Sequence, residues 1–466
     1  MQSTAPPAPR LAQLLLAHLL LALQSAGCDD QQRQQRLHAS SAGSSSAVSS
    51  GTGSSARSQR FSAVWNCPYM GPQVAGKYGL TANPSGSFNG TEMVLFYGPK
   101  TWPSLTAAYN PAPAATPCWK VPEDCRMVKC PQHPCTWNQS AIWANITVAS
   151  NGGVPQAGDI ELHKAAVAAM VEAMIPDPEF SGHAIFDQES WRVMYGCNDY
   201  GLSYSNHYSD LLVQRQNPGW NATRISQEAE RQYNAGARLF FTETLRTAKK
   251  LRPKGKFGFY EYPLGCHATP GAYPNDGVSP ELLWLWREVG VMAGSDYLRT
   301  RATTASSVNR SIAAVNLAEA AARAAGTVFV RPDILVYVWL WPSAKPVSAE
   351  QLDASIRVPA AMGADGIILW GSSGDAHVSG YDDTLTAFLA STVGPLIEKC
   401  QTERTLCATS LCSGHGRCSS YDATHPERGC QPLETGTAVV CLCDAGYHGV
   451  ACSKHKPPAA KSMLVV

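Results

Sequence analysis

Hydrophobic residues in the second half of the chain follow two patterns. Apolar positions three and four residues apart predict helices, and short apolar runs bounded by Gly or Pro predict strands. Helical spacing covers residues 160–175, 227–251, 312–325, 349–362 and 384–393, and Pro359 is a point where the fourth helix could end early. Apolar runs cover residues 183–186, 256–260, 334–341 and 366–370. This alternation predicts βα units around a parallel sheet.

The fold class predicted from this order is α/β. One long run of βα units favours a closed, TIM-like (β/α) barrel over an open sheet, and we expect it over residues 61–400. In such a barrel the side chains at the carboxyl ends of the strands meet at one mouth. Asp187, Tyr260 and Trp370 lie at or just after expected strand ends.

A carboxyl pair follows the expected strand at residues 183–186. Asp187 and Glu189 are two positions apart, so they share one face if the strand continues. Two carboxyls this close do not both ionise easily, and one pKa should rise. A carboxyl that keeps its proton is the acid that cleavage of a glycosidic bond requires. A solvated strand end is the ordinary alternative.

The N-terminal part predicts export. Arg10 precedes an apolar run at 11–23 and small residues follow, which is typical of a secretory signal peptide over residues 1–27; an uncleaved anchor is the alternative. Residues 28–60 are rich in Ser, Gln and Gly and predict a disordered linker. No later segment is long and apolar enough for a membrane span. The net charge of +1 does not point to nucleic acid.

Cysteine content and glycosylation signals agree with a secreted or lysosomal protein. The chain has 16 cysteines, which suits an oxidising compartment. Asparagines in Asn-x-Ser/Thr triplets are Asn89, Asn138, Asn145, Asn221 and Asn309, whereas Asn83 precedes proline and is excluded. Four cysteines gather at 118–135, where local disulfides are favoured over a zinc site because the spacing lacks paired Cys-x-x-Cys arms. We expect no metal.

Residues 401–455 are predicted to form a separate module before a tail at 456–466. The Cys-x-Cys-x8-Cys ending with its Gly-aromatic turn resembles an EGF-like domain. The resemblance implies three disulfides, Cys407–Cys418, Cys412–Cys441 and Cys443–Cys452. A binding module and a cap packed on the barrel are both open, and we favour the cap. Cys430 is an extra cysteine of this region.

From residue 61 to 452 the chain resembles the animal hyaluronidases. The motifs that carry the resemblance stand in order at 92–97 (EMVLFY), 180–192 (FSGHAIFDQESWR), 252–260 (RPKGKFGFY), 284–286 (WLW), 295–298 (SDYL), 363–370 (GADGIILW) and 411–418 (LCSGHGRC). The resemblance implies a distorted barrel that hydrolyses β-1,4 N-acetylhexosaminide bonds in hyaluronan or a related glycosaminoglycan. It implies no cofactor, and we expect a monomer.

The resemblance also assigns roles. Glu189 matches the general acid, and Asp187 the carboxyl that orients the substrate acetamido group. Tyr260 matches the tyrosine that holds the acetamido oxygen, which attacks the sugar in place of a protein nucleophile and gives retention. Tyr297 and Trp370 match the walls of the acetamido pocket.

Two further residues are assigned to substrate binding. Tyr97 ends the first motif, and Arg192 follows the acid by three positions. A structural ion pair is an equally open reading of Arg192.

The chain departs from the family pattern beside the site. Gln188 stands where a tryptophan is common, and Glu261 where a glycine is common. A further carboxyl could repel a polyanion or shift the working pH. Residues 102–105 (WPSL) replace a common aromatic pair, so we expect an altered cleft.

Several cysteines have no implied partner: Cys67, Cys197, Cys266, Cys400 and Cys430. A Cys197–Cys266 bond is one hypothesis. Two other functional readings remain, a glycan-binding protein that hydrolyses slowly or not at all, and a chitinase-type barrel, which would need a longer acidic series before its glutamate.

Overall fold

A computed structural model of the chain describes residues 61–67, 76–83, 90–107, 146–198, 202, 204–263, 280–297, 303–324, 331–341, 346–371, 381–420, 439–444 and 446–455. The expected signal peptide, linker, cysteine cluster and tail lie outside these residues, as do Asn89, Asn138, Asn145, Cys266 and Cys430.

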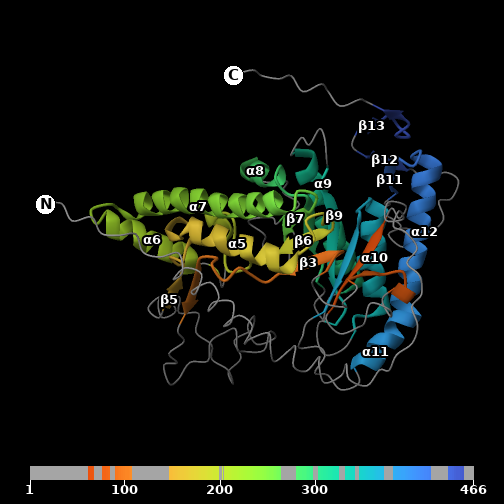
Figure 1. The fold of residues 1–466 in the computed structure, drawn as a ribbon, viewed down its shortest axis with the longest axis horizontal. Helices are drawn as coiled ribbons and strands as arrows, with labels where there is room; N and C mark the ends of the chain where they lie inside the picture. The colour runs from red at the N-terminus through yellow and green to blue at the C-terminus, as the bar shows by residue number, and fades with distance from the viewer. Residues whose placement is uncertain are drawn as a thin grey trace. The chain divides into compact units, whose positions relative to one another are not determined.

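Parallel strands form the wall of a barrel in two sheets (Figure 1). The first sheet has the order β2 (Thr81–Ala82), β1 (Ser62–Asn66), β10 (Gly366–Trp370), β9 (Asp333–Trp339) and β8 (Val291–Ser295). The second has the order β3 (Met93–Phe96), β6 (His183–Phe186) and β7 (Lys256–Phe259). An isolated parallel bridge between Tyr260 and Ala293 joins β7 to β8. A separate antiparallel pair is formed by β4 (Ser104–Ala107) and β5 (Ile146–Ser150).

A buried side chain connects the two strands at the open edges of these sheets, β2 of the first and β3 of the second. Asn83 follows β2 and is 2% exposed. Its Oδ1 accepts from the backbone N–H groups of Glu92 and Met93, each at 3.1 Å, and its Nδ2 donates to the Met93 carbonyl at 2.8 Å. One amide side chain thus satisfies the edge of β3 in the way that a neighbouring strand would.

We expect Asn83→Ala to lower the free energy of unfolding by about 1–3 kcal/mol, because backbone groups at a buried edge lose their partners. Urea denaturation measures this loss. The matched control is Glu172→Ala, an exposed position of helix α5, which should shift the midpoint little. An Asn83→Ala midpoint equal to that of the control would contradict the role of Asn83 in closing the barrel.

Helices cover the strands. They are α5 (Ile160–Met174), α6 (Tyr204–Gln216), α7 (Ala222–Leu251), α8 (Leu283–Trp286), α9 (Thr304–Ala324), α10 (Ala349–Met362), α11 (Tyr381–Phe388) and α12 (Gly394–Leu411). Helix α7 packs against α5 and α6, and α9 packs against α10 (Figure 1). Side-chain caps start three of them, because Asp159, Asn221 and Ser348 accept from backbone N–H groups of the first turn.

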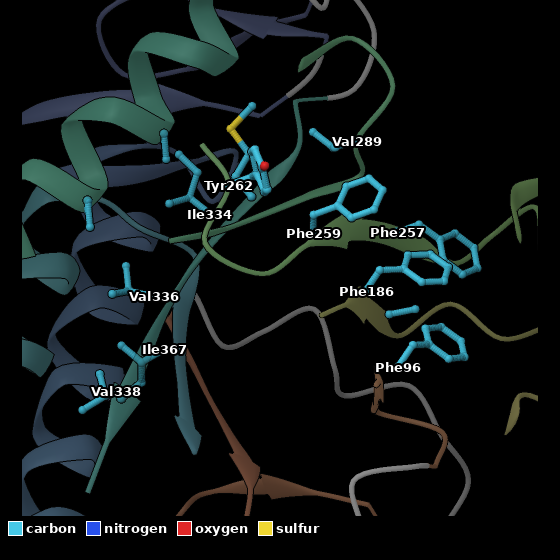
Figure 2. Packing of buried hydrophobic residues seen from close by; sticks show 14 of the residues in the cluster. Phe96, Phe186, Phe257, Phe259, Tyr262, Val289, Ile334, Val336, Val338 and Ile367 are labelled. Carbon is cyan, nitrogen blue, oxygen red and sulfur yellow. The ribbon is translucent and has the colours of Figure 1, made fainter. Parts of the chain in front are cut away.

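Alternate residues of the strands enter two different cores. Phe96, Phe186, Phe257 and Phe259 belong to the core that the strands share with residues of helix α7, such as Phe241. Figure 2 shows the four rings next to one another. The rings of Phe96 and Phe186 stack with centroids 4.7 Å apart. Residues of the opposite parity fill the barrel interior, among them Leu95, Ile185, Leu335 and Ile368. This parity decides which side chains reach the mouth.

Most expected elements are present, with shifted ends. Strands β6 and β10 have the expected bounds, whereas α7 begins five residues earlier than its apolar spacing indicates, at the Asn221 cap. Helix α10 does not end early: it runs through Pro359 to Met362 and ends at Gly363, which has a φ of 86°. The expected last helix, residues 384–393, falls in the end of α11 and a π-helical segment (Leu389–Val393), and α12 continues from Gly394 beyond the expected end.

Three disulfides join described residues of the C-terminal region. They join Cys407 to Cys418, Cys412 to Cys441 and Cys443 to Cys452, which are the pairs that the EGF-like resemblance implies. Helix α12 runs without a break through residue 400, where the boundary was expected, and carries Cys407 into the module. Two short antiparallel pairs follow, β11 (Gly416–Ser419) with β12 (Val440–Cys443), and β13 (Tyr447–His448) with β14 (Lys454–His455).

Arg417 ties this region to the barrel. Its guanidinium is buried, donates to the Gly363 carbonyl, and lies 3.2 Å from the Asp365 carboxylate. Asp365 also accepts from Arg331 at 2.6 Å and from the Ile334 N–H at 2.7 Å. This part-buried, shared ion pair joins β11 to the loop before β10.

Candidate active site

The backbone ladders continue past the strand ends and place the acidic pair. The Asp187 N–H donates to the Phe96 carbonyl at 2.9 Å, and the Tyr260 N–H donates to the Phe186 carbonyl at 3.0 Å. Asp187 therefore keeps the inward parity of Ile185 just beyond β6, and Tyr260 lies beside it just beyond β7. The sequence prediction that both lie at strand ends agrees with these positions.

A pocket opens at this end of the barrel. The residues that line it come from β3, β6, β7, β8, β9 and β10 or directly follow them: Leu95, Asp187, Glu189, Tyr260, Tyr297, Tyr337 and Trp370. All of these strands contribute at their carboxyl ends, where active sites of (β/α) barrels lie.

Aromatic rings form most of the wall. Tyr297 and Trp370 stack with centroids 5.4 Å apart and an angle of 25° between their planes. The indole Nε1 of Trp370 donates to the Tyr97 hydroxyl at 3.1 Å, which brings Tyr97 to the same mouth. Tyr260 meets Tyr337 edge-on at 5.1 Å, and its hydroxyl donates to Ser295 Oγ at 3.2 Å. Such a surface suits the apolar face of a sugar ring.

The side chains of Asp187 and Glu189 lie close enough to influence the pKa of each other. Burial, with the charge of Glu189, raises the pKa of Asp187 to about 7. The pKa of Glu189 is also raised, by partial burial and by the charge of Glu261. Asp187 lies deeper, with Oδ1 fully enclosed, whereas the Glu189 side chain reaches solvent at the mouth. The pair should therefore stay singly protonated into the neutral range.

Arg192 forms an ion pair with Glu261 rather than with Asp187 or Glu189. Its Nη1 lies 2.6 Å from Glu261 Oε2, and both side chains are about one fifth exposed. The guanidinium still lowers the pKa of Glu189 through its charge. Its partner, Glu261, stands at the position where the animal hyaluronidases commonly have a glycine.

The other two positions that depart from the family pattern, Gln188 and Trp102, have buried side chains. Gln188 is buried, and its Oε1 accepts from the Ser190 N–H at 3.1 Å. Trp102 is also buried, with its ring 5.9 Å from that of Trp191, so it does not line the pocket. His183 lies at the other end of β6, where its Nε2 is 2.9 Å from Asp333, which agrees with a structural role.

Sequence reasoning missed three residues of the site, Leu95, Tyr337 and Trp339. Tyr337 belongs to an expected strand and is two positions from Leu335, so both side chains lie on the same, inward face. This alternation along the strand could have identified Tyr337 from the sequence. Trp339 has the same parity and packs 5.3 Å from Trp370. No group of three His, Cys, Asp or Glu side chains in the described residues could hold a metal ion.

Similarity to known proteins decides the family. A sequence profile of glycoside hydrolase family 56, described as hyaluronidase, matches residues 142–428, which is more than half of the chain. The chain belongs to the hyaluronidase family. It is therefore a glycoside hydrolase, of the hyaluronoglucosaminidase class.

Curated hyaluronidases are similar over most of their length. Hyaluronidase of Apis mellifera is 28% identical over 362 residues, which are 73% of this chain and 84% of the relative. Hyaluronidase-1 of Homo sapiens is 27% identical over 387 residues, 79% of this chain and 80% of the relative.

A solved structure supports the barrel. The crystal structure of bee venom hyaluronidase in complex with a hyaluronic acid tetramer matches with a TM-score of 0.58 at 28% identity. The match covers 72% of this chain and 98% of the bee protein. The distorted TIM-like barrel predicted from the sequence is thereby confirmed.

Proposed function

We propose that this hyaluronidase cleaves the β-1,4 N-acetylhexosaminide bonds of hyaluronan with retention of configuration, and that the substrate supplies its own nucleophile. The observation that carries the proposal is the position of the Asp187 and Glu189 carboxyls, both with raised pKa, in a pocket walled by aromatic rings. The bee venom relative was solved with a hyaluronic acid tetramer, which supports the choice of substrate.

The first step moves one proton and exchanges one bond. The proton that Asp187 holds in the free protein passes to Glu189, the more accessible carboxyl, when substrate binds. Glu189 gives it to the glycosidic oxygen as the bond from that oxygen to C1 breaks. The carbonyl oxygen of the substrate acetamido group bonds to C1 and forms a cyclic oxazolinium ion. Ionised Asp187 then faces the positive charge that develops on the acetamido nitrogen, and accepts its N–H.

The second step reverses the roles. Glu189, now a carboxylate, takes a proton from water while the water oxygen bonds to C1 and the oxazolinium ring opens. Two displacements at C1 give net retention. Tyr260 and Tyr297 hold the acetamido group in the geometry for attack, and Trp370 bounds its methyl end.

The direct test is to follow products of hyaluronan, chondroitin and chitin oligomers. We expect new reducing ends from hyaluronan, and proton NMR of the first turnovers should show the β-anomer before mutarotation. An α-anomer would overturn the retaining mechanism. No reducing ends from any of the three would favour the alternative, a glycan-binding protein on the same barrel.

We expect Tyr260→Phe to lower kcat by about 10- to 100-fold, because the acetamido oxygen loses a positioning donor while the ring stays in place. Steady-state kinetics on hyaluronan measure the change. The matched control is Tyr208→Phe on helix α6, away from the residues that line the pocket. Equal kcat values in the two variants would remove Tyr260 from the proposed machinery.

We also propose that the protein enters the secretory pathway and is glycosylated. Asn221 and Asn309 are exposed. Asn221 caps α7 through Oδ1, which accepts from the Arg224 N–H at 2.9 Å, so the cap uses a different atom from the Nδ2 that a glycan would modify. Cys197 and Cys400 are disulfide-bonded, which suits an oxidising compartment, and the Cys197–Cys266 pairing stays a hypothesis. No helix in the described part of the chain could cross a membrane.

A further inference from the structure

A carboxyl side chain lies in the apolar layer behind the pocket. The alternation of side chains along β8 directs Ser295 and Tyr297 toward the barrel interior, and Asp296, which lies between them, to the opposite side. Met292, which has the same parity as Asp296, belongs to the apolar core on that side. Asp296 is fully buried there. A carboxyl in an apolar layer lowers stability unless its oxygens are paired, so Asp296 is a candidate for a role other than packing.

Helix α9 holds this segment through two adjacent side chains. The Ser311 hydroxyl donates to Asp296 Oδ2 at 2.5 Å, and Arg310 Nη1 donates to the Tyr297 carbonyl at 3.0 Å. From the other direction, the Asp296 N–H donates to the Tyr337 carbonyl at 2.9 Å. These contacts fix the side chain of Asp296 and the backbone on either side of it.

The two neighbours of Asp296 belong to the active site. Ser295 Oγ accepts from the Tyr260 hydroxyl at 3.2 Å, and the Tyr297 ring stacks on Trp370 with centroids 5.4 Å apart. Tyr260, Tyr297 and Trp370 line the pocket. A shift of Asp296 would therefore move one ring of the wall and the partner of the Tyr260 hydroxyl together. Small displacements of this kind are costly where a reacting group must be held in place.

The Asp296 carboxyl is only partly paired. Burial raises the pKa of Asp296 to about 7, although the Ser311 hydroxyl opposes the rise, as does the charge of Arg310. Ser355 of α10 is close enough to lower this pKa as well, but within the described residues its hydroxyl and Asp296 Oδ1 form no hydrogen bond. An apolar side chain of similar size would avoid the cost of burying this carboxyl. A role in positioning can therefore be separated from a role in stability.

We propose that Asp296 is a positioning residue of this active site, because its hydrogen bond with Ser311 sets the place of the two pocket residues beside it. Those residues, Ser295 and Tyr297, in turn set the place of the substrate acetamido group. The inference rests on the proposed function, since it concerns the pocket in which that group would react. Asp296 faces away from the pocket and acts through its neighbours.

The experiment uses Asp296→Leu, which is apolar and of similar size. We expect its urea midpoint to equal or exceed that of the wild type, since no carboxyl is buried. Its kcat on hyaluronan should nevertheless fall by roughly 10- to 100-fold, because the acetamido group is no longer held in the geometry for attack. KM should change by about twofold at most, since the aromatic rings that bind the sugar are all retained.

Two further variants keep the test decisive if Asp296→Leu folds poorly. Asp296→Asn keeps an oxygen that accepts from Ser311 and matches the neutral carboxyl, so its kcat should stay within about twofold of the wild-type value. Ser311→Ala removes the donor and should reproduce the fall in kcat. The matched control is Ser307→Ala, one turn earlier on α9. The buried Ser307 hydroxyl donates to the Thr303 carbonyl at 3.1 Å, and its loss should leave kcat unchanged.

Equal kcat values in Ser311→Ala and Ser307→Ala overturn the inference, as does a fall in Asp296→Asn as large as that in Ser311→Ala. The proposed function is judged separately, by wild-type release of reducing ends from hyaluronan. Release by the wild type with equal kcat values in the two serine variants removes only the role of Asp296. Absence of release by the wild type removes the proposed function, and with it the inference.

Discussion

Glu189→Gln should lower kcat on hyaluronan by about 10²–10⁴, because the leaving oxygen loses its proton donor while the side chain keeps its shape. We expect KM to change little, since the aromatic walls that bind the sugar are untouched. Reducing-end release at several substrate concentrations measures both parameters. The matched control is Glu172→Gln, an exposed position of α5, which should retain wild-type kcat. Wild-type turnover in Glu189→Gln would remove this residue from the chemistry.

Asp187→Asn should reduce activity and, above neutral pH, stabilise the fold. The native protein holds the Asp187 proton up to about pH 7, whereas the unfolded chain releases it near pH 4. Unfolding between these values therefore releases a proton, and the wild-type protein loses stability as the pH rises from about 4 to 7. Asparagine stays neutral, so the variant does not lose this stability. Above pH 7 we expect its free energy of unfolding to exceed that of the wild type by about 2–4 kcal/mol.

Urea denaturation of both proteins at pH 4 and pH 8 measures this difference. We expect nearly equal stabilities at pH 4 and a more stable Asp187→Asn protein at pH 8. The loss of activity should persist at every pH, since the amide cannot accept the acetamido N–H in the way that a carboxylate does. A stability difference that does not depend on pH would contradict a proton held by the native pair.

Much of the barrel could be predicted because its helices and inner strands are strongly patterned. Strands β6 and β10 are continuous apolar runs between turn residues, and α5 shows clear helical spacing. Strand β3 is four residues long and β8 contains Gly294, so apolar pattern alone did not separate them from loops. The closure of the barrel by Asn83 was beyond pattern analysis, since a side chain there takes the place of a strand.

The candidate site also contains residues that the sequence could predict and residues that it could not. Asp187 and Glu189 were predictable because period-two geometry past a short strand leaves them few other arrangements. The Arg192–Glu261 pair was not, because it joins residues 69 positions apart and depends on a left-handed turn at Glu261. Sequence could show that Glu261 departs from the family pattern, but only the fold shows which cation it neutralises.

The most direct test of Glu189 as the acid is the leaving-group dependence of Glu189→Gln. We would compare hyaluronan oligosaccharides with oligosaccharides whose aglycone is 2,4-dinitrophenol, which departs without protonation. If Glu189 donates the proton, the variant should approach the wild-type rate of bond cleavage on the dinitrophenyl substrate while remaining about 10²–10⁴ slower on hyaluronan. An equal loss on both substrates would contradict that role.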